Sequence, residues 1–357
     1  MSDSNVLYKN MILKLVQESP LEIDTEIQLQ GRTPTTVSSE FITNKEQGDW
    51  AERLVYGAIN KSTKYVAVRY GRSDSLAAGE EGFKQFYEEY QSELNTIGKL
   101  PDLLIFNKTD YYEGIEKSPE DIKTAGCAIE VRSSSFLVEK YNAYMKNRSD
   151  KATRRIDELR QSIFSNPVLD ALLKEKNPTI YEALKTTELS NFRNGITFTF
   201  RRLSSSPELR ELSEKIKEIK DNIKIIQTRD YLSITPKFED IALVNRWIQC
   251  FNVPHYYLQV FFDKAYIISF EDILRISSDP KNEGIRFSIE RDTKNQGKTT
   301  VKIDVRTTEL VIDEIVMPNH NSQMKELDRG RLLFYVRFDG GEGSLKESVF
   351  ENILKWI

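Results

Sequence analysis

Two acidic residues and one arginine stand in apolar surroundings, where a charged side chain is unfavourable unless another group pairs with it. Asp102 begins the apolar segment 103–106, and Glu130 lies inside the apolar segment 125–131, two positions before Arg132. Side chains alternate along a strand, so Glu130 and Arg132 share one face. If the two segments are neighbouring strands, Asp102 and Glu130 can hold one divalent cation, with Arg132 beside them to contact a phosphate or orient water. Carboxylate oxygens suit Mg²⁺, and such a cation supports phosphodiester hydrolysis by neutralising charge and activating water.

A second interpretation requires no chemistry at these positions. Asp102 then caps a turn, and Glu130 and Arg132 lie on a solvated face of a sheet. The spacing leaves both interpretations open, because Pro-Asp and Glu-x-Arg are short patterns that often occur by chance.

Histidine and cysteine offer little material for other catalytic chemistries. His255 and His320 are the only histidines, and the only cysteines, Cys127 and Cys250, lie in apolar contexts without a CxxC spacing. Neither a zinc site nor a Ser-His-Asp triad is expected from so few residues. We expect both cysteines to be buried free thiols.

Hydrophobic patterning predicts one continuous α/β body, since there is no internal repeat and no long Gly-rich or Pro-rich linker. The expected helices are 8–17, 45–59, 81–94, one that begins at Pro207, 239–251 and a short last helix that ends in Trp356. The expected strands are 65–70, 101–106, 125–133, 195–202, 230–235, a strand or hairpin over 255–268, and a β-rich tail at 285–290, 301–305, 309–316 and 332–338. The helix after Pro207 carries apolar residues every three or four positions. That spacing fits either a helix packed on the core or a helix–helix seam, within or between subunits.

The overall charge does not indicate a general nucleic-acid binder. Lys and Arg total 51 against 55 for Asp and Glu, a net charge of −4, so a contact with nucleic acid needs a local concentration of positive charge. No apolar run approaches the roughly 20 residues of a membrane-spanning helix, so we expect no membrane contact. The first residues lack the pattern of a secretory signal, which makes the cytoplasm the expected compartment.

Positive charge is concentrated in the segment 140–160, with tyrosines between the basic residues. The candidates for phosphate contacts are Lys140, Lys146, Arg148, Arg154 and Arg155. The alternative is a solvated helix face whose basic residues pair with nearby acids. A second group, Asn191, Arg193, Asn194, Arg201 and Arg202, could read base edges, although turn chemistry explains the asparagines equally well.

Four segments resemble a known group of nucleases. Pro101-Asp102 followed by Glu130-Val-Arg132 is similar to the PD-(D/E)xK nuclease signature, and 47–52 resembles the early helix that adds an acid to the site in many such enzymes. The longer segments 130–140 and 253–264 are similar to the AccI-type group of type II restriction endonucleases. The resemblance spans roughly residues 46 to 276.

The resemblance implies an Mg²⁺-dependent type II restriction endonuclease that cuts both strands of double-stranded DNA at a short palindromic site, generally as a homodimer. It implies a restriction-endonuclease-like α/β fold, with a mixed central sheet flanked by helices and a β-rich C-terminal region. We expect an N-terminal helix and arm at 1–44, a nuclease core with a DNA-contacting helical insertion at 45–276, and the β-rich region at 277–357. A cognate DNA methyltransferase is expected as a functional partner that is not a bound subunit.

The resemblance also assigns roles to the residues of the site. Asp102 and Glu130 become metal ligands, Glu52 a possible accessory ligand, and Arg132 takes the third position of the motif. Most related motifs have lysine there, whereas a guanidinium stays protonated and cannot act as a base. Arg132 is therefore assigned to charge stabilisation and water positioning. Two alternatives stay open: a structure-specific or repair nuclease of the same fold, and a noncatalytic DNA-binding module.

Overall fold

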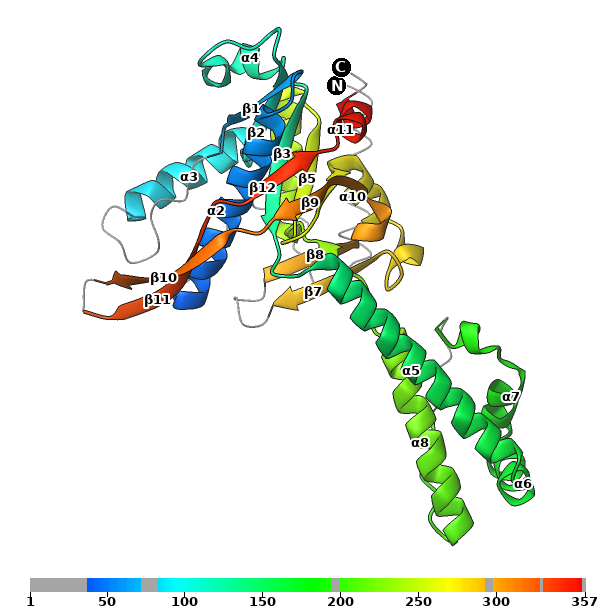
Figure 1. Cartoon of the computed structure of the whole chain (residues 1–357). Helices are drawn as coiled ribbons and strands as arrows, with labels where there is room; N and C mark the ends of the chain where they lie inside the picture. The colour runs from blue at the N-terminus through cyan, green and yellow to red at the C-terminus, as the bar shows by residue number, and fades with distance from the viewer. Residues whose placement is uncertain (1–36, 72–82, 194–198, 293–297, 328–329, 355–357) are drawn as a thin grey trace. The chain divides into compact units, whose positions relative to one another are not determined.

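The computed structural model describes five stretches of the chain, residues 37–71, 83–193, 199–292, 298–327 and 330–354 (Figure 1). Its contacts divide the chain into two compact units. The first, here called the sheet unit, comprises Met1–Val138 and Leu232–Ile357, and the second, the helical unit, is Glu139–Tyr231.

A mixed sheet of seven strands forms the centre of the sheet unit. The strand order is β1-β2-β3-β5-β6-β9-β12. The strands are β1 (Tyr65–Arg69), β2 (Leu103–Asn107), β3 (Cys127–Ser133), β5 (His255–Val260), β6 (Ala265–Ser269), β9 (Glu309–Val316) and β12 (Glu342–Leu345). All neighbours are antiparallel except β3 and β5, which are parallel. A parallel pair needs a long crossover, and here the crossover contains the helical unit and the helix α9 (Phe238–Phe251).

One face of this sheet is covered by α2 (Ser39–Asn60), as Figure 1 shows. The helix begins where the Ser38 side chain accepts a hydrogen bond from the Phe41 amide, at 3.1 Å. Its apolar side, including Trp50 and Leu54, packs on the inward residues of β2, β3 and β5 in one buried core. The C-terminal helix α11 (Glu347–Leu354) joins this core through Phe350. Burial of these residues supplies the main stabilisation of the sheet.

The other face of the sheet lies under α9 and α10 (Phe270–Ser277). The ring of His255 on β5 lies 6.1 Å from that of Trp247 in α9 and 6.3 Å from that of Phe270 in α10. The helix α3 (Phe83–Ile97) in turn contacts α9. Charged residues on this face are therefore enclosed by helices.

Shorter elements complete the sheet unit. They are α4 (Pro119–Ile122), the 3₁₀ turns η1 (Ile115–Lys117), η3 (Pro280–Asn282) and η4 (Val305–Thr307), a small sheet of β4 (Ser233–Ile234), β8 (Lys298–Asp304) and β7 (Phe287–Asp292), and the hairpin of β10 (Asn319–Glu326) and β11 (Leu332–Asp339). The hairpin lies beside α2, where the Thr43 hydroxyl accepts from the Val336 amide at 3.1 Å (Figure 1). The strands β9 and β12 show that residues beyond 276 share one sheet with the earlier strands.

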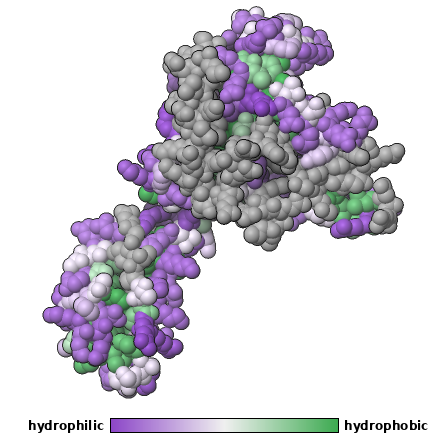
Figure 2. All heavy atoms as spheres, turned by 180° about the vertical axis from the view of Figure 1, so that it is seen from behind, coloured by the Kyte–Doolittle hydropathy of each residue, from purple (hydrophilic) through white to green (hydrophobic). Residues whose placement is uncertain are grey.

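The helical unit has a core of its own. Its helices are α5 (Val138–Phe164), α6 (Pro167–Lys176), α7 (Pro178–Thr186), η2 (Leu189–Arg193) and α8 (Pro207–Gln227). Ile156 and Ile163 of α5 are buried together with Ile216 and Ile223 of α8. The apolar positions of α8 thus pack on a core inside this chain. On the face that Figure 2 shows, the surface of the unit is mainly hydrophilic, with smaller hydrophobic patches.

The mixed α/β class and the sheet flanked by helices are confirmed. A strand over 195–202 is wrong for 199–202, which form no regular element, while 194–198 lie outside the described residues. The helix expected at 8–17 and the end of the last helix at Trp356 also lie outside them. Cys127 is buried as expected, but Cys250 is exposed because it faces outward near the end of α9. The boundaries expected at residues 44 and 276 remain predictions.

None of the helices that the structure describes combines the length and the apolar character needed to cross a membrane.

Candidate active site

Asp102, immediately before β2, lies close to Glu130 of the neighbouring strand β3. Leu103, the first residue of β2, pairs with Ile129 of β3, the residue next to Glu130. The Val131 amide donates to Asp102 Oδ2 at 2.6 Å, which orients the carboxylate. Sequence spacing had required only that the two strands be neighbours, and the structure confirms that they are.

Gly71 fixes the backbone beside Asp102. The Tyr70 amide donates to the Asp102 carbonyl oxygen at 3.0 Å. A Cβ on Gly71 would lie 3.1 Å from the Pro101 oxygen and 3.2 Å from Asp102 Cα, closer than nearly all real Cβ contacts. Only glycine fits here without moving Asp102.

Glu130 is buried, with 1% of its surface exposed, and its two carboxylate oxygens have different surroundings. Its Oε1 forms ion pairs with Lys99 Nζ and, at 2.8 Å, with Arg132 Nη2. Its Oε2 is buried and has no hydrogen-bond partner among the described residues. Burial this deep excludes a solvated sheet face as the explanation for Glu130. An unpaired buried carboxylate oxygen is unfavourable, unless a cation or water reaches it.

A second buried acid joins the same group. Asp240, in the first turn of α9, is 2% exposed, and its Oδ2 lies 3.3 Å from both Lys99 Nζ and Arg132 Nη2. Lys99, Glu130, Arg132 and Asp240 thus form four alternating charges, here called the charge cluster. Neither Lys99 nor Asp240 was singled out from the sequence. The available signals were a lysine three positions before Asp102 and an acid on the inner side of an amphipathic helix.

The electrostatics of the acids differ. Burial, with Glu130 and Glu52 nearby, raises the pKa of Asp102 well above its usual value. Burial, with Asp49 and Glu130 nearby, raises the pKa of Glu52 to about 7. Burial would also raise the pKa of Glu130, but Lys99 and Arg132 outweigh it, so the pKa of Glu130 is lowered. Glu130 is therefore ionised, whereas the neighbouring Asp102 and Glu52 lose their protons only at a higher pH than usual.

Glu52 approaches the site from α2, on the opposite side of the sheet from α9. Its carboxylate interacts electrostatically with Glu130 and Asp102. One turn earlier on the same helix, the buried side chain of Gln47 makes a hydrogen bond of 2.7 Å with Ser135 Oγ, just after β3. That bond ties this part of α2 to the end of the strand that carries Glu130.

The donor set fits a hard divalent cation with few protein ligands. Within the described residues, no three His, Cys, Asp or Glu side chains stand close enough to form a complete metal site. Mg²⁺, however, commonly takes one or two carboxylates and keeps several waters. The partnerless Oε2 of Glu130 and the raised pKa of Asp102 both indicate a place where positive charge would be stabilising.

The candidates for DNA contact lie in the helical unit. They differ in whether they already form ion pairs with acidic side chains of that unit. Arg155 pairs with Glu158 and Glu218, at 3.0 and 2.6 Å. Arg193 pairs with Asp230, and Arg202 with Glu214. The remaining candidates are exposed at Lys140, Lys146, Arg154, Asn191 and Arg201 and half-buried at Arg148, while Asn194 lies outside the described residues.

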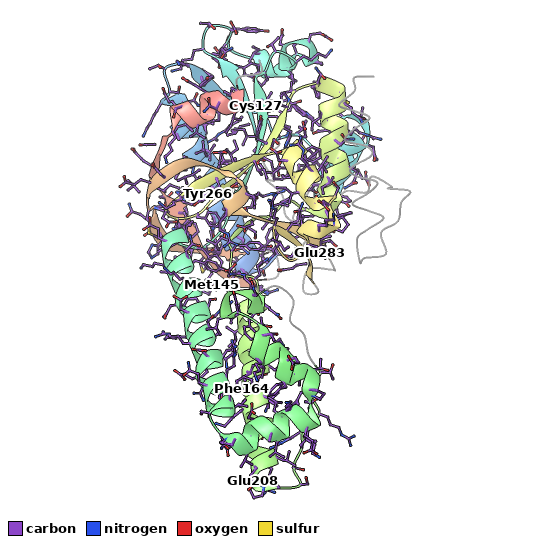
Figure 3. All side chains as sticks on the ribbon, turned by 90° about the vertical axis from the view of Figure 1, so that its right-hand side faces the viewer. Cys127, Met145, Phe164, Glu208, Tyr266 and Glu283 are labelled. Carbon is purple, nitrogen blue, oxygen red and sulfur yellow. The ribbon has the colours of Figure 1, made fainter. Side chains whose placement is uncertain are left out.

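One face of α5 gathers basic, amide and aromatic side chains. Lys140, Tyr144, Asn147, Lys151 and Arg154 are exposed and recur at spacings of four and three, so they lie in one row along the helix. We call this row the α5 stripe. In Figure 3, the labels of Met145 and Phe164 identify α5, and the labels of Cys127 and Tyr266 identify the seven-stranded sheet. In the described part of the chain, Lys140 and Lys151 have no ion pair or hydrogen bond.

Comparison with known proteins gives one finding. A model of the family described as AccI restriction endonuclease matches residues 7–356, which is nearly the whole chain. No curated protein matches the sequence. No solved structure matches it either.

Proposed function

The chain belongs to the AccI restriction endonuclease family, and we propose that it is a type II restriction enzyme that uses Mg²⁺ to hydrolyse both strands of duplex DNA at a short palindromic site. The observation that carries this proposal is the proximity of Asp102 and Glu130, with a buried oxygen of Glu130 that has no hydrogen-bond partner among the described residues. Two buried carboxylates close together, one just before β2 and one inside β3, are costly to maintain for structure alone.

The side chains of this site divide the work between them. Asp102 and Glu130 Oε2 would hold the cation, with Glu52 as an accessory group from α2. A bound divalent cation would neutralise charge on the phosphate and ease the ionisation of water. Arg132 cannot take up a proton. Its contacts with Glu130 and Asp240 support a role in holding the acids and balancing their charge.

We assign the sheet unit to a restriction-endonuclease-like core of the PD-(D/E)xK type. Three features support the assignment: the meander β1-β2-β3, the strand β5 that follows a helix and runs parallel to β3, and the placement of Asp102 immediately before β2 and of Glu130 on β3. An early helix that brings Glu52 toward the same acids adds to them.

The α5 stripe is our candidate for contacts with the DNA backbone. Lysines without acidic partners can exchange counterions with phosphates, and the exposed ring of Tyr144, at 64%, adds a surface for sugar or base contact. Arg155, Arg193 and Arg202 are weaker candidates, because each would first have to leave an acidic partner. Asn191 and Arg201 stay candidates for reading bases.

A palindromic DNA substrate has consequences for the oligomeric state of the enzyme and for the other proteins that the host needs. A palindromic site presents the same phosphate geometry twice, related by a two-fold axis, so two copies of one active site suit it. We therefore propose a homodimer. Cutting the host's own DNA would be lethal, so a cognate DNA methyltransferase is the expected functional partner. The enzyme would act in the cytoplasm, where the DNA lies.

Cleavage of a long duplex of known sequence tests the proposal. With Mg²⁺, the purified protein should give discrete bands, whereas Asp102→Asn and Glu130→Gln should bind the same DNA and leave it intact. The control is Asp110→Asn, because Asp110 is exposed after β2 and pairs only with nearby polar side chains; this variant should cut like the wild type.

The same assay separates the alternatives. Cutting confined to branched or damaged DNA would replace the restriction enzyme with a structure-specific nuclease. Binding without any Mg²⁺-dependent cutting, over varied DNA and metals, would leave a DNA-binding module. Full activity of Asp102→Asn or Glu130→Gln would reject the assigned site.

A further inference from the structure

A lysine outside every motif stands beside the candidate metal ligands. Lys99 Nζ pairs with Glu130 Oε1 and lies 3.3 Å from Asp240 Oδ2. An ammonium group has three donors, so these two acceptors leave it one N–H. The side chain is 13% exposed, so the group is enclosed but not sealed from solvent.

Arg132, the other cation of the cluster, is placed differently. It uses one nitrogen, Nη2, for both Glu130 and Asp240, and its Nε is buried without a partner among the described residues. The guanidinium is broad and planar, whereas the ammonium of Lys99 is a compact charge with rotatable donors. Both cations thus bridge the same two acids, and Lys99 differs from Arg132 in offering a compact charge whose remaining N–H can turn toward a third group.

The two oxygens of Glu130 allow a cation and Lys99 to be present together. Lys99 and Arg132 occupy Oε1, and Oε2 has no hydrogen-bond partner among the described residues. A cation held by Oε2 would therefore leave the ion pair of Lys99 with Oε1 intact. The Lys99 ammonium would then add a second positive charge beside the phosphate that the site binds.

Lys99 and Asp102 lie in one short segment of the chain, between α3 and β2. Gly98 ends α3 with φ +86°, and the Lys99 amide donates to the Leu243 carbonyl oxygen of α9 at 3.1 Å. Asp102 follows three residues later, immediately before β2. The segment 98–102 therefore delivers both a cation and a carboxylate to the same place.

The geometry points to Lys99 as a catalytic residue of the proposed hydrolysis. Its remaining N–H contacts the scissile phosphate and stabilises the negative charge that grows there, in the place of the lysine that the related motif has at the position of Arg132. The ammonium keeps its proton, and no bond to Lys99 forms or breaks. Glu130 and Asp240 hold it in place, and Arg132 pairs with the same two acids. This inference rests on the proposed function.

Single-turnover cleavage, with enzyme in excess over DNA, tests the inference. Removing one donor to developing charge typically lowers a rate about 100-fold to 1,000-fold, and we expect that loss for Lys99→Met. Lys99→Arg keeps the charge but not its compact shape, and should lose far more activity than Arg132→Lys. The control is Lys123→Met, because Lys123 is an exposed lysine that pairs with Glu120. Lys99→Arg decides the question if Lys99→Met does not fold.

Binding of Mn²⁺ to the protein without DNA gives a second readout. Lys99→Met removes a positive charge near the ligands, so it should bind Mn²⁺ at least as tightly as the wild type, while Glu130→Gln should bind it more weakly. Weakened binding in Lys99→Met to the level of Glu130→Gln would overturn the inference. So would Lys99 variants that cut within threefold of the wild type, or a larger loss in Arg132→Lys than in Lys99→Arg. A wild type that never cuts would instead remove the proposed function, and the inference with it.

Discussion

Gly98 packs against the backbone of Leu243, so that the chain just after α3 closely approaches α9. A Cβ on Gly98 would clash with the Leu243 carbonyl oxygen and come within 2.8 Å of the Trp247 nitrogen. The residue that follows is Lys99, and Asp240 lies one turn before Leu243 on the helix. This close approach is what brings the two halves of the charge cluster together.

Gly98→Ala should therefore destabilise the protein. The left-handed backbone alone costs roughly 1–2 kcal/mol for a residue with a Cβ, and the clash with α9 adds to it. Urea unfolding measures the loss. The matched control is Gly48→Ala: Gly48 lies inside α2 with nothing within 4 Å of a built Cβ, so alanine there should stabilise by about 0.5–1 kcal/mol. Equal effects at the two positions would contradict the described packing.

Asp240→Asn should unfold more easily while keeping its shape. Removing one partner from a buried ion pair typically costs about 3–5 kcal/mol, since the opposite charges stay buried. A double-mutant cycle with Lys99→Met should give a coupling energy of about 0.5–3 kcal/mol, because the two side chains are in contact. Additive losses would mean that the two residues stabilise the protein independently.

His255 makes the stability sensitive to acid. Burial lowers the pKa of His255 to about 3, below the usual 6.5, so the unfolded chain takes up a proton that the folded protein refuses. The contribution is fully present above pH 6.5 and is lost as the pH falls toward 3, with a slope of at most about 1.4 kcal/mol per pH unit.

His255→Phe should lower that slope relative to the wild type, because the new ring can pack beside Trp247 and Phe270 without a proton. The raised pKa values of Glu52 and Asp102 act in the opposite direction over this pH range, but they are common to both proteins, so the difference between the two slopes reports on His255. The measurement is the free energy of unfolding between pH 5 and pH 7.5 in the presence of a chelator. His320→Phe serves as the control, since His320 is exposed on β10, and its slope should match that of the wild type. A slope in His255→Phe equal to that of the wild type would show that His255 does not contribute to the acid sensitivity.

Lys151→Ala should weaken DNA binding to a similar degree on every sequence. The loss of one phosphate contact should reduce the slope of log K against log[salt] by about 0.9. Arg155→Ala is the comparison, because Arg155 already pairs with two glutamates, and its effect on the slope should be smaller. Filter binding or fluorescence anisotropy across salt concentrations measures both. An unchanged slope in Lys151→Ala would remove the α5 stripe from the interface.

Local pattern was enough to predict the strands that carry the acids. Alternation along β3 puts Glu130 and Arg132 on one face, and the structure has them there, bridged to each other. The helix that carries Glu52 and the helix before β5 also follow from apolar spacing, which depends only on neighbours in the chain. The strand β10 escaped prediction, because its residues are mostly polar and exposed and its order comes from pairing with β11.

The composition of the charge cluster was decided by tertiary structure. Lys99 and Glu130 are 31 positions apart, and Arg132 and Asp240 are 108 apart, so no periodic pattern links them. Their meeting depends on the parallel pairing of β3 with β5, on α9 lying over that face, and on a glycine that lets α3 approach α9. The sequence by itself determined Asp102, Glu130 and Arg132 as residues that could do chemistry. The long-range packing added Lys99 and Asp240 and determined which cation stands beside which acid, because a buried charge is stable only where the fold brings an opposite charge next to it.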